Sequence, residues 1–123
     1  MPILDIEIVQ AEGEPAFAAG LAQALADAAG RSLGAAPGRT WVRLRSLPSS
    51  HYAESQAGVG AGELPVFVNL LQARPPQGDA LAVEVRALTM VLAACLARAP
   101  ERVHVQYAPP GAGRQAFGGE LVR

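Results

Sequence analysis

Two short motifs occur twice in this chain, both at a spacing of 63 residues. Pro2–Leu4 recurs as Pro65–Phe67, and the stretch 36–42 (APGRTWV) recurs as 99–105 (APERVHV). Two matches at one spacing indicate a pair of similar units joined in one chain. With 123 residues, the chain is too short for two independent domains, so we predict a single domain over 1–123 that contains two internal repeats, about 1–60 and 64–123.

Each unit has the pattern of a strand, a helix and a second strand. Alternation of apolar and acidic residues predicts a first strand over 3–9, and helical spacing predicts a helix from residue 15 to about residue 33, followed by a strand over 40–47. The second unit predicts a strand over 66–71, a helix over 79–98 with Asp79 capping its first turn, and a strand over 103–107. Right-handed crossovers make the strands of each unit parallel. We therefore predict an α+β fold, in which the duplicated β-α-β units form a four-stranded mixed sheet with two helices on one face.

The other face of this sheet needs a cover. Val66, Val68 and Leu70 alternate with the apolar Phe67 and Leu71, so both faces of that strand carry apolar side chains. Helices on one face leave the second face open, and oligomerisation would cover it. The connection over 48–63 is rich in glycine and is either a functional loop or a plain linker.

Composition excludes several classes of function. The chain has ten arginines, no lysine and a net charge of -1, so we expect no nucleic-acid partner and no binding to a membrane surface. No apolar run reaches the roughly 18 residues that a membrane-spanning helix needs, which predicts a soluble, cytoplasmic protein. The single Cys95 lies among leucines and reads as a core thiol, and His51 and His104 belong to no metal-ligand cluster. We expect no metal and no cofactor.

Several of these features together resemble one family. Met1-Pro2 precedes a strand, an Ala-Pro step precedes the second strand of each unit, Arg74 follows the third strand, and 117–121 reads FGGEL. Over nearly its whole length the chain resembles the tautomerase superfamily, specifically 4-oxalocrotonate tautomerase and its longer members in which two short subunits are fused. The resemblance implies a homotrimer that acts on a small carboxylate substrate.

Pro2 is the residue that the resemblance marks as catalytic. Removal of Met1 would expose a secondary amine, which in the family serves as the base or acid. A generic α-amino group titrates near 7.7 to 8, and desolvation or nearby cations can bring such an amine toward neutrality, where a base is most effective. The alternative is that Pro2 merely starts an edge strand.

The resemblance also implies arginines that bind the substrate's carboxylate. Arg74 lies nine residues beyond Pro65, where the family places such an arginine about ten beyond its proline; the alternative is a solvated loop residue. The family's second arginine aligns with Trp41 or His104. Arg43 lies on the same strand face as Trp41 and could supply that charge, or could belong to an exposed arginine ladder.

Aromatic residues complete the expected pocket. Tyr52 occupies the stretch where the family has an aromatic residue beside its proline, and is otherwise a loop tyrosine. His51 and Glu54 could relay a proton or activate a water molecule, or could be solvated. Phe117 and His104 are expected at the pocket or interface of the second unit.

We therefore expect an isomerase that interconverts the keto and enol forms of a small carboxylate, with Pro2 moving the proton and Arg74 holding the acid group. On the same scaffold, a hydratase or dehalogenase could use protonated Pro2 with Glu54 activating water, and a decarboxylase is a further variant. The other class is a non-catalytic small-molecule-binding module of ferredoxin-like outline, which would separate the two strands that flank each helix.

Overall fold

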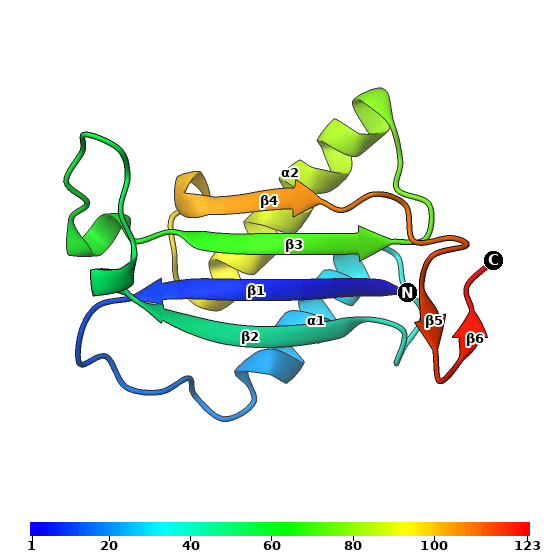
Figure 1. Ribbon diagram of the computed structural model, residues 1–123, viewed down its shortest axis with the longest axis horizontal. Helices are drawn as coiled ribbons and strands as arrows, with labels where there is room; N and C mark the ends of the chain where they lie inside the picture. The colour runs from blue at the N-terminus through cyan, green and yellow to red at the C-terminus, as the bar shows by residue number, and fades with distance from the viewer.

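The protein folds into one mixed sheet with two helices packed on one side of it (Figure 1). The computed structural model describes residues 1–123, except for the side chain of residue 61. The main elements are β1 (Pro2–Gln10), α1 (Leu21–Ser32), β2 (Trp41–Pro48), β3 (Val66–Gln72), α2 (Gly78–Leu96) and β4 (Val103–Tyr107).

The sheet has the strand order β2-β1-β3-β4. β2 runs parallel to β1 and β4 parallel to β3, whereas β1 and β3 are antiparallel. The predicted α+β class with a four-stranded mixed sheet is confirmed. The two strands that flank each helix are neighbours, so the topology differs from the ferredoxin-like arrangement.

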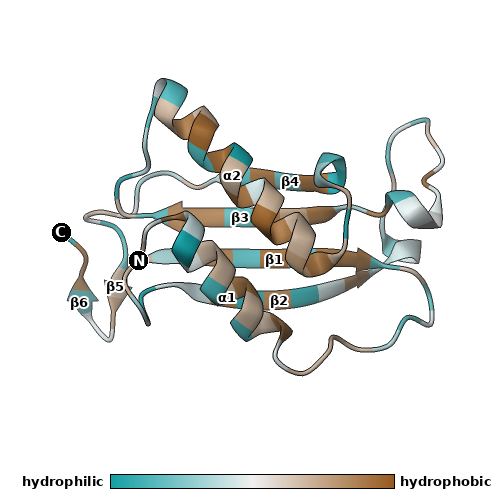
Figure 2. Cartoon of the chain, turned by 180° about the vertical axis from the view of Figure 1, so that it is seen from behind, coloured by the Kyte–Doolittle hydropathy of each residue, from teal (hydrophilic) through white to brown (hydrophobic). Residues whose placement is uncertain are grey.

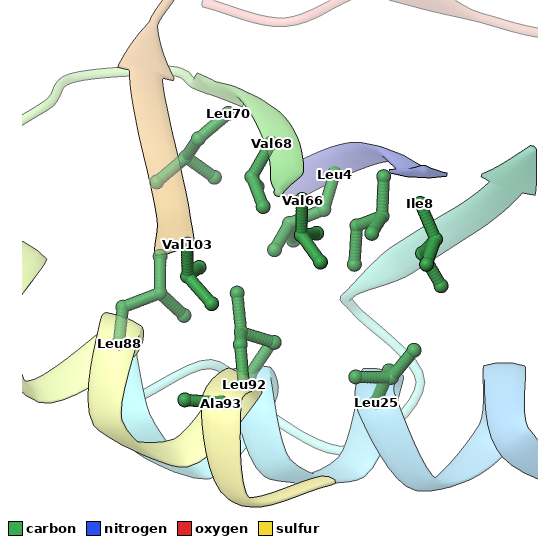
Figure 3. Packing of buried hydrophobic residues seen from close by; sticks show 12 residues of the cluster. Leu4, Ile8, Leu25, Val66, Val68, Leu70, Leu88, Leu92, Ala93 and Val103 are labelled. Carbon is green, nitrogen blue, oxygen red and sulfur yellow. The ribbon is translucent and has the colours of Figure 1, made fainter. Parts of the chain in front are cut away.

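The core lies between the helices and one face of the sheet. Side chains alternate along a strand, and every second residue of β1 and β3 is buried against the helices. Figure 2 shows both helices on this side, and Figure 3 shows side chains of β3 and α2 meeting between the two layers. The largest fully buried aliphatic side chains come from both units: Leu4, Ile6, Val9, Leu25, Val66, Leu70, Leu88 and Leu92.

Both helices differ from their predicted bounds. α1 begins at Leu21 and not at residue 15, because its N-cap Gly20 has a φ of 86°, a left-handed conformation outside the helical region. Phe17 packs against the core from the preceding loop. α2 is preceded by Gln77 as its N-cap, so Asp79 lies inside the first turn, and it ends at Leu96 because Ala97 has a φ of 52°.

Several short helices and strands were not predicted from the sequence. The connection over 48–63 contains two single-turn 3-10 helices, Ser49–His51 and Ala61–Glu63, and a third, Pro100–Arg102, precedes β4. A hairpin of β5 (Ala116–Phe117) and β6 (Glu120–Leu121) turns through Gly118 and Gly119, with φ values of 56° and 89°. Positive φ at both turn positions is typical of a tight two-residue hairpin loop. The hairpin lies beside the N-terminus (Figure 1).

The face of the sheet away from the helices is polar at its centre. Asp5 is paired with Arg43, and the Glu7 carboxylate lies 3.9 Å from the guanidinium of Arg45. Phe67, on β3, is 39% exposed on this face. Among the residues that the structure describes, no helix has both the length and the apolarity to cross a membrane.

Candidate active site

Pro2 lies at one end of the sheet, in a pocket of about 450 Å³. The pocket forms where the start of β1 meets the residues that follow β3 and the loop between α1 and β2. Pro2 itself is buried. The lining residues include two arginines: Met1, Pro2, Leu33, Gly34, Ala35, Ala36, Arg39, Gln72, Ala73 and Arg74. The structure thus brings the predicted Pro2 and Arg74 together.

Arg39 is a pocket residue that the sequence reasoning missed. Its guanidinium carbon lies 5.6 Å from the centre of the Trp41 ring, and that ring stacks on Phe117 at 4.7 Å between ring centroids. A cation over an aromatic face is held electrostatically, so Trp41 and Phe117 restrict where Arg39 can lie. The internal repeat could have pointed to Arg39, because Arg39 matches Arg102 at the same spacing of 63 residues.

The surroundings of the N-terminus favour a neutral amine. The pKa of the Met1 amine is lowered, first by burial and second by the positive charge of Arg39. Both effects disfavour the charged ammonium form. The pocket therefore shifts an amine at this position toward its neutral, basic form.

Arg43 lies outside this pocket, contrary to its predicted role. Its Nε and Nη2 atoms donate to the two carboxylate oxygens of Asp5 at 2.5 and 2.8 Å, on the open face of the sheet. This fork lowers the pKa of Asp5, chiefly through the hydrogen bond from Arg43. Trp41 shares that strand face but lies at the first position of β2, next to the Pro2 end, whereas Arg43 is two residues further along.

Tyr52, His51 and Glu54 lie at the opposite end of the sheet from Pro2 in the same chain. β1 and β2 are parallel, so the segment that follows β2 emerges beside the end of β1 and not beside its start. Figure 1 shows this connection at the end of the sheet away from the N-terminus. Within one chain, the predictions that Tyr52 walls the Pro2 pocket and that His51 or Glu54 relays a proton there are wrong.

At that far end, Glu54 is held by two partners. The Tyr52 hydroxyl donates to Glu54 Oε2 at 2.5 Å, and Arg102 Nη2 donates to the same oxygen at 2.6 Å. These hydrogen bonds, the one from Tyr52 first, lower the pKa of Glu54. Burial and the bond to Glu54 raise the pKa of Tyr52. Glu54 is thus a tightly bound carboxylate and not a free base.

Glu54 contacts the second unit at Arg102, the residue that corresponds to Arg39 of the first unit. Arg102 and His104 stand 63 residues after Arg39 and Trp41, and the His104 ring lies 5.4 Å from that of Phe67. His104 therefore lies beside Phe67 in the second unit, and its role at a pocket or interface stays a prediction. Phe117 does not lie at the second unit's Pro65 end: it stacks on Trp41 at the Pro2 end, because the chain leaves β4 at the end of the sheet where β1 begins.

A second hollow, of about 340 Å³, lies on the open face of the sheet between Glu7, Arg45 and His104. It contains no amine, and its floor is the charged centre of that face, so the Pro2 pocket is the better candidate for chemistry. Among the described side chains, no group of three His, Cys, Asp or Glu residues is close enough to hold a metal ion.

Comparisons with known proteins agree with the topology. No family model and no curated protein matches the sequence. Among solved structures, a fused 4-OT named Q0, a wild-type symmetric trimer, superposes with a TM-score of 0.74 at 21% identity, covering 98% of this chain and 94% of that one. The chain has the tautomerase fold.

Two further tautomerase-fold structures resemble it. Pt0534, solved after inactivation by 2-oxo-3-pentynoate, has a TM-score of 0.71 at 18% identity, covering 97% of this chain and 95% of that one. Malonate semialdehyde decarboxylase, described with decarboxylase and hydratase activities, has a TM-score of 0.67 at 16% identity, covering 94% and 90%. This likeness extends over nearly the whole of each chain, so both units and the hairpin beside Pro2 belong to the shared tautomerase fold.

Proposed function

We propose that the protein is an isomerase that interconverts the keto and enol forms of a small carboxylate, with the amine of Pro2 as the acid and base after Met1 is removed. One observation carries this proposal: Pro2 is buried in a pocket that also contains Arg39 and Arg74. A base beside two cations is the combination that enolisation of a carboxylate requires.

The reaction uses one proton and two charge contacts. Arg74 holds the carboxylate of the substrate, and its planar fork suits that group. The neutral Pro2 amine removes a proton from the carbon next to the carbonyl, and the electron pair moves onto the carbonyl oxygen. Arg39 stabilises this enolate, and the prolinium delivers the proton to the enolate oxygen, which gives the enol; the reverse sequence gives the keto form.

Burial and Arg39 support the protonation state that this mechanism needs. They lower the pKa of the amine at Met1, and removal of Met1 transfers the amine to the adjacent Pro2 in the same pocket. A secondary amine starts with a higher pKa than a primary one, so the two effects act in the useful direction.

The lining of the pocket favours isomerisation over hydration, dehalogenation or decarboxylation assisted by a carboxylate. None of the described side chains that line it is acidic. Glu54, which would have activated a water molecule, is bound to Tyr52 and Arg102 at the far end of the sheet. Isomerisation needs only the amine and the two arginines.

We also propose that the chain assembles as a homotrimer. The fused 4-OT chains with the same fold are trimers, and the open face of the sheet carries the exposed Phe67. A large apolar side chain on a sheet face suits contact with another copy. The cytoplasmic location stays a prediction.

The proposal is tested by replacing the amine. Untagged protein is first checked by intact mass for loss of Met1, and ketonisation of phenylenolpyruvate or 2-hydroxymuconate is followed by ultraviolet absorbance. We expect Pro2→Ala, which replaces the secondary amine by a primary one, to lose at least about 100-fold in kcat/KM, within the usual range for general acid–base groups.

Pro65→Ala is the matched control, because Pro65 occupies the equivalent place in the second unit but its nitrogen is an internal amide. That variant should keep wild-type activity. Full turnover by Pro2→Ala, or retention of Met1 in active protein, would remove the amine from the mechanism.

A further inference from the structure

The C-terminal hairpin of β5 and β6 is anchored beside Arg74. The segment that joins β4 to the hairpin runs along the end of β3. Gly111 N donates to the carbonyl oxygen of Gln72 at 2.8 Å, and the next amide, that of Ala112, donates to the carbonyl oxygen of Ala73 at 3.1 Å. Gln72 and Ala73 line the Pro2 pocket and immediately precede Arg74. The base of the hairpin is therefore fixed to the backbone that carries Arg74.

Close packing holds this segment against β3. A Cβ atom placed on Gly111 would lie 3.2 Å from Leu71 Cδ1, which is closer than ordinary van der Waals contact, so a larger residue would push the segment away. The hairpin is closed at its base by the bond from Val122 N to the carbonyl oxygen of Gln115, at 2.7 Å. The position of the hairpin beside the N-terminus is thus set by both hydrogen bonds and packing (Figure 1).

Phe117 extends the hairpin to the side of the pocket where Arg39 lies. Its ring stacks on that of Trp41, with 4.7 Å between the centroids and 23° between the planes. The guanidinium carbon of Arg39 lies 5.6 Å from the centroid of the same Trp41 ring. Phe117 and Trp41 lie outside the set of residues that line the pocket, so their contact with the site runs through Arg39.

Arg39 needs such support because it is an exposed loop residue. Its backbone N donates to the carbonyl oxygen of Ala36 at 3.1 Å, which closes the turn, whereas its guanidinium is held over the Trp41 ring. A long arginine side chain has many rotamers when nothing holds it. The interaction between two charges weakens as their separation grows, so the effect of Arg39 on the N-terminal amine depends on where that guanidinium lies.

We infer that Phe117 holds Arg39 at the Pro2 amine by fixing the Trp41 ring, and that the C-terminal hairpin is therefore part of the active site. The inference rests on the proposed function and adds to it the element that places one cation relative to the base. Phe117 and Trp41 are positioning residues, because they act through Arg39. The base of the same hairpin fixes the segment of Arg74, the other charged residue that lines the pocket.

The pKa of the Pro2 amine tests this contact without turnover. It is measured by an NMR titration of protein that carries ¹⁵N-labelled proline and has lost Met1. We expect Phe117→Ala to raise this pKa, in the same direction as Arg39→Ala but by less, because a displaced guanidinium still acts from a greater distance. Phe117→Tyr keeps the stacked ring and should keep the wild-type pKa.

A double variant separates positioning from a general loss of burial at the amine. In an Arg39→Ala background, Phe117→Ala should not change the pKa further, because the residue through which it acts is absent. Phe117→Leu fills most of the same space without a ring, so it should raise the pKa even if Phe117→Ala does not fold. Leu121→Ala is the matched control, since Leu121 lies on β6 of the same hairpin and is 47% exposed.

Kinetics give a second measurement of the contact. At a pH where the amine is neutral, we expect Phe117→Leu to lower kcat by about 10-fold and to change KM by less than about 2-fold, because enolate stabilisation suffers while Arg74 still binds the carboxylate. Leu121→Ala should keep both constants.

The outcomes distinguish this inference from the proposed function. A wild-type pKa and kcat in Phe117→Leu, an equal effect of Leu121→Ala, or a further rise in pKa in the double variant would each overturn the role of Phe117, while turnover that depends on Pro2 would still stand. The expected pKa changes in a processed protein without ketonisation activity would leave the contact intact and remove the isomerase.

Discussion

At the scale of single residues, the candidate site depends on two arginines with different duties. Arg39 sits against Trp41 and lowers the pKa of the N-terminal amine. Arg74 follows β3 and lines the same pocket. In the proposed mechanism, Arg39 therefore tunes the base and stabilises the enolate, whereas Arg74 is assigned to carboxylate binding alone.

Variants of these two arginines should separate the duties. Arg39→Ala removes a positive charge that disfavours the ammonium form, so the pKa of the amine rises toward its ordinary value. The acidic limb of the pH profile of kcat/KM then moves to higher pH, because a larger share of the amine is protonated at each pH below the new pKa. Arg74→Ala should raise KM and lower kcat without moving that limb.

The control for both is Arg86→Ala, on the exposed side of α2. It removes the same charge far from the pocket and should leave the kinetics and the pH profile unchanged. An Arg39→Ala profile that coincides with the wild type would show that Arg39 does not tune the amine.

At the scale of elements, alternation and helical spacing were sufficient to predict all four strands of the sheet and both helices. The start of α1 was not predictable in this way, since Gly20 sets the N-terminal limit of the helix through a backbone conformation that apolar periodicity does not report. The hairpin at 116–121 was missed because its strands are two residues each, although Gly118-Gly119 is a recognised turn signal.

The site was predicted only where its residues are tied to strand ends. Pro2 and Arg74 follow from the start of β1 and the end of β3, which are adjacent in an antiparallel pair. Tyr52 was misplaced because sequence order does not show that the parallel β2 carries it to the opposite end of the sheet. Arg39 lies in a loop, so its proximity to Pro2 depends on tertiary packing.

One carboxylate, that of Glu54, holds the connection between the units in place. The contribution of its hydrogen bonds to the free energy of unfolding should depend on pH. Glu54 bonds to Tyr52 in the same segment and to Arg102 next to β4. Its pKa is lower in the folded state than in the unfolded chain. The stabilisation is therefore present above the unfolded-state pKa, about 4.3, and is lost as the pH falls through the folded-state pKa.

Glu54→Gln should accordingly lower the urea midpoint of unfolding at pH 7, with the difference from wild type shrinking as the pH falls below about 4. Glu101→Gln is the control, since Glu101 is an exposed acid in the 3-10 helix before β4. A Glu54→Gln midpoint equal to the wild type at pH 7 would mean that these hydrogen bonds contribute no net stability.

At the scale of the whole molecule, the open face of the sheet links the fold to assembly. Its centre is satisfied internally, because Arg43 is bound to Asp5 and Arg45 lies near Glu7. Phe67 stands beside this charged centre, with Tyr52 and His104 as ring neighbours. The face therefore combines an apolar aromatic contact with paired charges, which suits burial against another copy better than free exposure.

The proposed trimer should depend on that aromatic contact. We expect the wild type to sediment with about three times the chain mass of 12.7 kDa, and Phe67→Asp to sediment with a smaller mass, because burying an unpaired carboxylate at a contact between copies is unfavourable. Val83→Asp is the matched control: Val83 is 70% exposed on α2, which packs on the other side of the sheet, so its charge should leave the assembly intact. A Phe67→Asp protein that keeps the wild-type mass, or a Val83→Asp protein that loses it, would move the interface away from the open face of the sheet.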